Sequence, residues 1–153
     1  MTSSMTSSMK YFATILTGLL LVLMVSAPVV AEGVTRLGPW EVRYNAFNST
    51  LLRPEMASQY NLQRSEYLAT LNIVIFAANK PGKPAQQVDI SGYAMNPLSQ
   101  QQPLNFQEVI EGEAVYYLAQ TRFTNAETLR FFITIEQDGI QEQLTFSETF
   151  MRH

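Results

Sequence analysis

The sequence predicts an all-β fold in which two antiparallel sheets pack face to face. Three observations lead to this prediction. Apolar and polar residues alternate with period two over most of the chain after residue 39, as they do in strands with one buried face. Turn signals rich in Gly, Pro, Asn and Asp divide this alternation into seven segments of strand length. Only residues 54–60 carry a helical pattern instead.

The first predicted strand covers residues 40–46, where large apolar residues alternate with polar ones. One short helix is predicted between the first and second strands, at residues 54–60. Pro54 and Glu55 suit its first turn, and good helix formers follow them. The second strand covers residues 66–77 and is apolar on both faces, which predicts a central place in its sheet.

The other five strands lie between the remaining turn signals, at residues 87–95, 104–110, 114–123, 129–137 and 140–150. A Gln-rich loop is expected at residues 96–103. In the fourth strand, Leu104, Phe106 and Ile110 share one face. Asp138-Gly139 joins the last two strands, since this dipeptide supplies the positive φ angles of a two-residue hairpin.

Seven short strands in a chain of this length favour a seven-stranded antiparallel sandwich of immunoglobulin-like type. An eight-stranded outer-membrane barrel is the competing architecture. Such barrels need an unbroken apolar band facing the lipid, whereas many strand faces here carry Glu, Gln, Thr and Arg. The sandwich is therefore the predicted fold.

The N-terminus predicts export through a cleavable signal peptide. An apolar run from Tyr11 to Val25 follows Lys10, and the small residues that end at Ala31 suit cleavage before Glu32. The apolar core is shorter than the roughly 20 residues that span a bilayer, although an uncleaved anchor is the alternative. We therefore expect a signal peptide at 1–31, a single domain at 32–153, and a periplasmic location, with secretion as the alternative.

Composition excludes several classes of function. Removal of residues 1–31 from 153 leaves 122, with 9 basic and 13 acidic residues spread without blocks. Nucleic-acid binding needs clustered basic residues, and a membrane-surface anchor needs a cationic amphipathic helix, so neither is expected. The chain has no Cys, and its one His is His153. Hence we expect no cofactor, no metal and no thiol or histidine catalysis.

The segment from Tyr44 to Thr50 is dense in amides, hydroxyls and aromatic rings at the end of the first strand. Loops and strand ends on a rigid scaffold often carry recognition, so Tyr44, Asn45 and Asn48 are candidate binding residues. Arg64 is a further candidate, as an anion contact. The alternative is structural, because Asn48 can satisfy backbone groups where the strand ends, and the rings can pack into the core.

Glu111 and Glu113 are the one candidate carboxylate pair. They flank Gly112, so a solvated hairpin tip is the favoured interpretation. Weak calcium binding is the alternative, although oxygen cages usually need more than two carboxylates.

The chain resembles a family of small exported bacterial proteins classified only as a domain of unknown function. The residues that carry the resemblance are Tyr44 to Ser49, Pro54-Glu55, Arg64-Ser65, Leu71-Asn72-Ile73, Gly112, Ala114 to Ala119, Glu127 to Phe131, Phe146 and Thr149-Phe150. The resemblance implies a periplasmic β-sandwich and supplies no activity. Arg43 stands where the family pattern often has histidine, so it implies no metal or proton-transfer role there.

These observations favour a non-enzymatic binding or accessory module that contacts another envelope protein through a sheet edge or a sandwich face. A small-ligand binder is the alternative. A hydrolase that uses Ser, Tyr and carboxylates is less favoured, because no Gly-x-Ser-x-Gly motif occurs. Oligomeric state does not follow from the sequence.

Overall fold

The structure is a computed structural model that describes residues 31–152. Within this range the chain forms nine strands, one 3-10 turn and one short α-helix. The elements are β1 (Ala31–Leu37), β2 (Trp40–Asn48), the 3-10 turn η1 (Ser49–Leu51), α1 (Pro54–Gln59), β3 (Leu68–Ala77), β4 (Asp89–Met95), β5 (Gln101–Pro103), β6 (Gln107–Glu111), β7 (Ala114–Arg122), β8 (Glu127–Gln137) and β9 (Ile140–Phe150).

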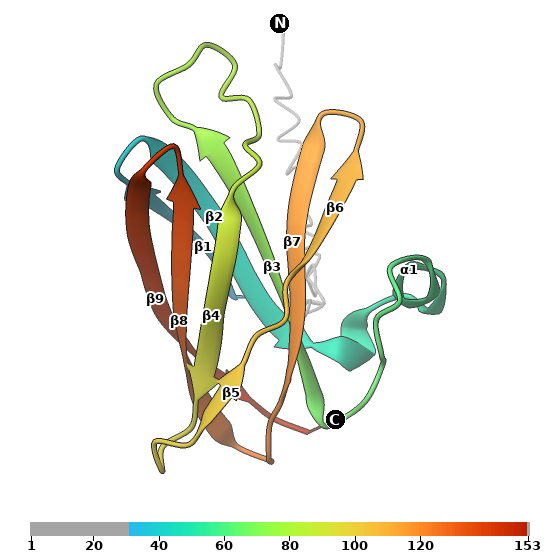
Figure 1. Cartoon of the computed structure of the whole chain (residues 1–153). Helices are drawn as coiled ribbons and strands as arrows, with labels where there is room; N and C mark the ends of the chain where they lie inside the picture. The colour runs from blue at the N-terminus through green and yellow to red at the C-terminus, as the bar shows by residue number, and fades with distance from the viewer. Residues whose placement is uncertain (1–30, 153) are drawn as a thin grey trace, which may run out of the picture.

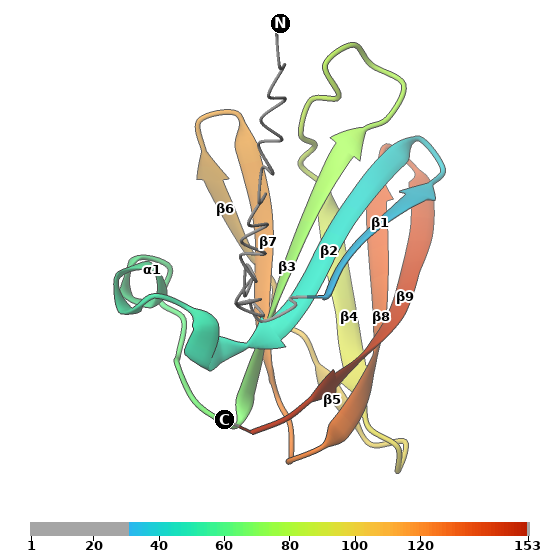
Figure 2. The ribbon, with the colours of Figure 1, turned by 180° about the vertical axis from the view of Figure 1, so that it is seen from behind.

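The strands form two separate antiparallel sheets that face each other (Figure 1). One sheet has five strands in the order β1-β2-β3-β7-β6, and the other has four in the order β5-β4-β8-β9. Figure 2 shows the five-stranded sheet from outside, with α1 lying beyond β7 and β6. All strand neighbours are antiparallel. The prediction of an all-β, two-sheet fold is therefore confirmed.

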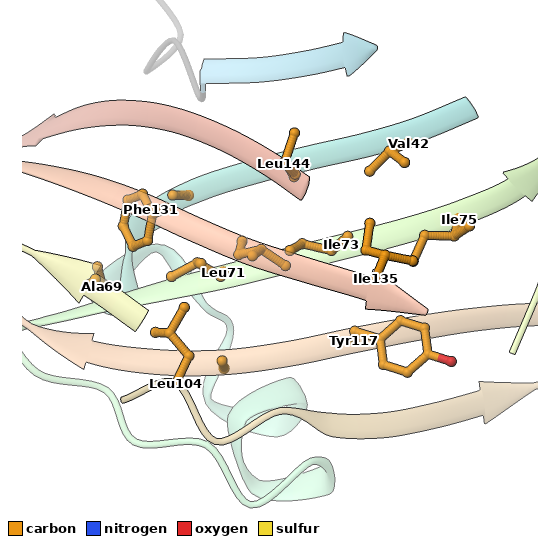
Figure 3. Packing of buried hydrophobic residues seen from close by; sticks show 14 of the residues in the cluster. Val42, Ala69, Leu71, Ile73, Ile75, Leu104, Tyr117, Phe131, Ile135 and Leu144 are labelled. Carbon is orange, nitrogen blue, oxygen red and sulfur yellow. The ribbon is translucent and has the colours of Figure 1, made fainter. Parts of the chain in front are cut away.

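The core fills the space between the sheets. Its centre combines Leu71, Ile73 and Ile75 of β3 with Phe131 and Ile135 of β8, all fully buried. Figure 3 shows these side chains gathered between the two layers. Because every second residue of a strand points to the same face, the alternation seen in the sequence produces this core directly. Burial of such side chains stabilises the fold by about 1.5–3 kcal/mol each.

Two detailed predictions are confirmed. The second predicted strand, apolar on both faces, is β3, and it is the central strand of the five-stranded sheet. Asp138 and Gly139 have φ angles of 52° and 77° and connect β8 to β9, whose register closes at Gln137 and Ile140.

The prediction of seven strands is wrong, because the structure has nine. The first missed strand is β1, which pairs with β2 along its whole length, from Ala31 with Ala46 to Leu37 with Trp40. Its sequence contains Gly33, which weakens a strand pattern, and few apolar residues. As an edge strand, β1 needs to pair only on one side, so weak patterning suffices.

The second missed strand is β5, within the segment predicted to be a Gln-rich loop. It is only three residues long and pairs with the end of β4. The fourth predicted strand also begins later than expected, since β6 starts at Gln107. Ile110 pairs in register with the buried Val115 but is itself 54% exposed, whereas Leu104 is buried. Strand β6 is at the edge of its sheet, so Ile110 has a neighbouring strand on one side only.

The predicted signal peptide lies outside the described residues except for Ala31, so the division at residues 31 and 32 stays a prediction. Within residues 31–152 no helix has the length and apolar character to cross a membrane.

Candidate functional site

The five-stranded sheet splits where β3 and β7 separate. Their pairing ends at Ile73 and Tyr117, although β2 pairs with β3 as far as Ala77 and β6 pairs with β7 as far as Ala114. Both ribbon views show the two strands diverging toward the β3–β4 connection (Figures 1 and 2). Beyond this point no ladder of hydrogen bonds joins β3 to β7, so the five-stranded sheet is divided into two parts.

The chain after β3 turns back along the free side of this strand. The Ala77 N–H donates to the Pro84 carbonyl at 2.9 Å, and the Gln86 N–H donates to the Ile75 carbonyl at 2.8 Å. Prolines at 81 and 84 lack N–H donors, which keeps this segment short and irregular. The connection therefore lies alongside β3 and forms one wall of the split, but it does not bridge β3 to β7.

A groove of about 880 Å³ lies at the split, on the outer face of the five-stranded sheet. Strand β3 contributes Val74 and Phe76 to it, and the β3–β4 connection contributes residues 81–85. The opposite wall comes from β7 and the hairpin that precedes it, with Tyr116 and Glu113. Glu32, Arg43, Tyr44 and Asn45 extend the groove across β1 and β2.

A smaller apolar pocket of about 200 Å³ continues beneath α1. Leu52, Met56 and Leu62, from α1 and its flanking turns, face Phe47 and Leu118 of the sheet across it. Helix α1 begins with Pro54 at its first position, where the missing N–H costs nothing, and it buries Ala57. The groove and the apolar pocket share Asn72 and Tyr116, so they are neighbouring parts of one surface.

Asn72 occupies the junction and is one of two polar residues in β3, the other being Thr70. It pairs in register with Asn45 of β2 and Leu118 of β7. Its side-chain Oδ1 is buried and accepts no hydrogen bond from any described residue. A buried acceptor without a donor costs about 1–3 kcal/mol, and such groups are rare in native proteins. Asn72 is therefore the least satisfied polar group on this surface.

Charge at the groove is organised around Glu41. Its carboxylate pairs with Lys83 at 2.5 Å and with Arg43 at 3.0 Å. The hydrogen bond from Lys83, and to a lesser extent the one from Arg43, lowers the pKa of Glu41 below its usual value. The guanidinium of Arg43 also lies 5.1 Å from the centre of the Phe76 ring. Both cations of the groove are thus engaged with Glu41, and Lys83 ties the β3–β4 connection to β2.

Two of the four candidate binding residues lie together at the groove. The Tyr44 ring points between the sheets, with its centroid 4.5 Å from that of Phe146, and the residue is also part of the groove lining. Asn45 projects from the outer face beside Asn72.

Asn48 and Arg64 do not line the groove. The Asn48 side chain is buried and donates to the Met151 carbonyl at 2.6 Å, which holds the end of the chain. Arg64 donates to the Thr50 carbonyl at 3.1 Å and so links the two turns that flank α1. In the structure both residues hold neighbouring backbone.

Sequence reasoning missed Asn72, Lys83 and Tyr116 as groove residues. One signal was available for Asn72, which is the amide in the middle of a strand that is otherwise almost wholly apolar. Glu113, predicted to be a solvated hairpin tip, is exposed and lines the groove. Within residues 31–152 no group of three or more His, Asp or Glu side chains is placed to hold a metal ion.

The fold and the groove define a small antiparallel β-sandwich with one split sheet. The chain belongs to the DUF4426 family, a domain of unknown function, whose model matches residues 34–152. A crystal structure of a DUF4426 family protein from Pseudomonas aeruginosa PAO1 is 32% identical, with a TM-score of 0.69, and the match covers 80% of this chain and 96% of that chain.

FetP of uropathogenic Escherichia coli strain F11 shares the fold at 13% identity. Its TM-score is 0.57, and the match covers 82% of this chain and 97% of that chain. A copper-bound variant of FetP is similar at a TM-score of 0.55 and 13% identity, over 81% of this chain and 97% of that chain. No curated protein matches the sequence.

Proposed function

We propose that this protein is a non-enzymatic binding module of the periplasm, of immunoglobulin-like type, that holds an extended segment of another envelope protein. The observation that carries the proposal is the groove of about 880 Å³ at the split between β3 and β7. Its walls combine backbone at strand ends with aromatic side chains, which together suit recognition of an extended chain. Nucleic acid is not an expected ligand, because the sequence has no basic cluster.

Export is supported by the apolar run from Tyr11 to Val25 and the small residues that end at Ala31. Secretion to the medium is the alternative location. The absence of Cys from the sequence and the presence of only one histidine support a role without catalysis. The groove lining offers carboxylates, amides and tyrosines, which suit hydrogen bonding.

Site-specific crosslinking in the periplasm tests the proposal. A photoreactive amino acid replaces Asn45 at the groove in one strain and Gln143 in another. Gln143 is exposed on β9 and does not line the groove, so it is the matched control. We expect a reproducible crosslinked protein from position 45 and none from position 143. Equal capture at both positions, or none at position 45, would contradict the proposal.

A small-ligand binder is the second candidate function, and the unsatisfied Oδ1 of Asn72 between the groove and the apolar pocket favours it. A thermal-shift screen of purified protein with amines, sugars, amino acids and lipids tests it. Copper belongs in the screen because a variant of the structural neighbour FetP is copper-bound. Stabilisation by one small molecule that is lost in the Asn72→Leu variant would favour this function over a protein partner.

A further inference from the structure

We propose that the groove recognises a basic side chain on the bound segment and that the pocket beneath α1 takes an apolar side chain next to it. This inference rests on the proposed function and specifies the chemistry of its partner. The partner segment is extended, carries Lys or Arg, and has a large apolar residue on the same side.

The first argument is charge complementarity. The groove and the apolar pocket are lined by the carboxylates of Glu32, Glu111 and Glu113. Arg43 and Lys83 are the cations in this lining, and both pair with the single carboxylate of Glu41. With Glu41 included, four carboxylates face two cations. The surface therefore has excess negative charge, which attracts a cation and repels an acidic segment.

The second argument is the missing hydrogen bond at Asn72, where the groove meets the apolar pocket. Asn72 Oδ1 is an acceptor without a donor from any described residue, so a ligand that donates there removes an unfavourable interaction. A lysine ammonium has three donors and an arginine guanidinium five, whereas a carboxylate has none. Tyr116 adds an aromatic ring to the same junction, and aromatic rings attract cations.

The third argument is the shape of the neighbouring pocket. At about 200 Å³ and with Leu52, Met56, Leu62, Phe47 and Leu118 in its lining, it has room for one large apolar side chain. It opens beside Asn72, on the same face of the sheet as the groove. In an extended segment, side chains two residues apart lie on one side, roughly 7 Å from each other. A basic residue and an apolar residue at this spacing fit the two subsites together.

Peptide binding to the protein without the predicted signal peptide, residues 1–31, tests the inference. The probes are extended hexapeptides with blocked ends that carry Leu and Lys two residues apart, together with matched peptides in which Lys is acetyl-lysine or Glu. We expect the Lys peptide to bind roughly tenfold more tightly than the acetyl-lysine peptide in fluorescence polarisation, with the difference shrinking at high salt. Equal binding of the Lys and Glu peptides would overturn the inference.

Single substitutions test which residues form the basic subsite. Asn72→Leu should weaken binding of the Lys peptide roughly tenfold, and Asn72→Asp should strengthen it, because the acceptor gains a charge. Glu113→Gln should weaken it, whereas Glu136→Gln, exposed and outside the groove lining, is the control for loss of one carboxylate. If neither Asn72→Asp nor Glu113→Gln changes the affinity, the basic subsite does not exist.

Three further results distinguish failure of this inference from failure of the proposed function. A crosslinked partner at position 45 together with no preference for Lys peptides would leave the proposed function intact and remove the basic subsite. A free diamine such as cadaverine that binds as tightly as the Lys peptide would overturn the assignment to a protein segment. Acetyl-lysine peptides that bind more tightly than the Lys peptide would overturn the basic subsite, because acetylation removes the positive charge.

Discussion

The ring of Tyr44 in β2 covers Gly33, its register partner in the edge strand β1. A Cβ atom at position 33 would collide with the Tyr44 ring, which occupies the space that a side chain there would need. On its other side the ring packs against Phe146 of β9, with centroids 4.5 Å apart. Gly33 thus permits one aromatic side chain of β2 to pack over β1 and against β9 of the other sheet.

Replacement of Gly33 by Ala should destabilise the protein by about 1–3 kcal/mol, because the new methyl group must push the Tyr44 ring off Phe146. Urea denaturation followed by fluorescence measures the change. Val34→Ala is the control, since Val34 is 60% exposed and its truncation should change the unfolding free energy by less than about 0.5 kcal/mol. The cost of Gly33→Ala should shrink in a Tyr44→Ala background, and an undiminished cost would refute the explanation.

The hydroxyl of Tyr117 joins the two sheets at the point where the chain crosses between them. It accepts from the Val88 N–H at 2.7 Å and lies 2.8 Å from Glu108 Oε2, to which it donates. Tyr117→Phe leaves the buried Val88 N–H without its acceptor and should cost about 1–3 kcal/mol. Tyr93→Phe is the control, because Tyr93 stacks on Phe132 on the outer face of the other sheet. Equal losses in both variants would contradict this account.

Tyr117 should also make the protein sensitive to alkali. Burial raises the pKa of Tyr117 to about 12 from its ordinary 10, and the bond to Glu108 acts in the same direction. Because the pKa of Tyr117 is higher in the folded protein than in the unfolded chain, its contribution to stability is fully present below the unfolded-state pKa of about 10. This stability is lost as pH rises through the folded value, so the loss should fall between about pH 10 and 12. Denaturation midpoints across this range should decline less in Tyr117→Phe than in the unmodified protein.

The sequence alone could predict the core strands because their period-two pattern is strong. Leu129, Phe131, Ile133 and Ile135 alternate without a break, and all four are fully buried. The pattern is weak where a strand pairs on one side only. Strand β1 has Gly33 and an exposed Val34, and the Gln-rich β5 is three residues long. Their pairing depends on the edges of β2 and β4, which no local pattern encodes.

The candidate site was predictable only in its local part. Tyr44 and Asn45 could be chosen because polar and aromatic residues cluster there in the sequence, and both line the groove. The groove itself arises because β3 and β7 separate beyond Ile73 and Tyr117, which are distant in the chain. The ion pair of Lys83 with Glu41 is also non-local. Single-sequence reasoning does not reach such pairings.

The hairpin between β8 and β9 should depend on Gly139. Its φ of 77° lies in the left-handed region, which a residue with a Cβ adopts at a cost of about 1–2 kcal/mol. Gly139→Ala should lower the unfolding free energy by about that amount in chemical denaturation. Gln141→Ala, at an exposed position two residues further on, provides the comparison. If Gly139→Ala is as stable as Gln141→Ala, the turn does not constrain the fold.

Glu41 should hold the wall of the groove in place through its bonds to Lys83 and Arg43. Since these bonds lower its pKa in the folded protein, their contribution is present above the unfolded value of about 4.5 and is lost as pH falls through the folded value. At neutral pH, Glu41→Gln should therefore speed hydrogen exchange at the Ala77 and Gln86 amides, which tie the β3–β4 connection to β3. Acidification of the unmodified protein should produce the same change, measured relative to intrinsic exchange rates. Glu136→Gln, at an exposed position on β8, is the control and should leave the protection of both amides unchanged. If Glu41→Gln also leaves it unchanged, the backbone hydrogen bonds alone hold the wall and the prediction is wrong.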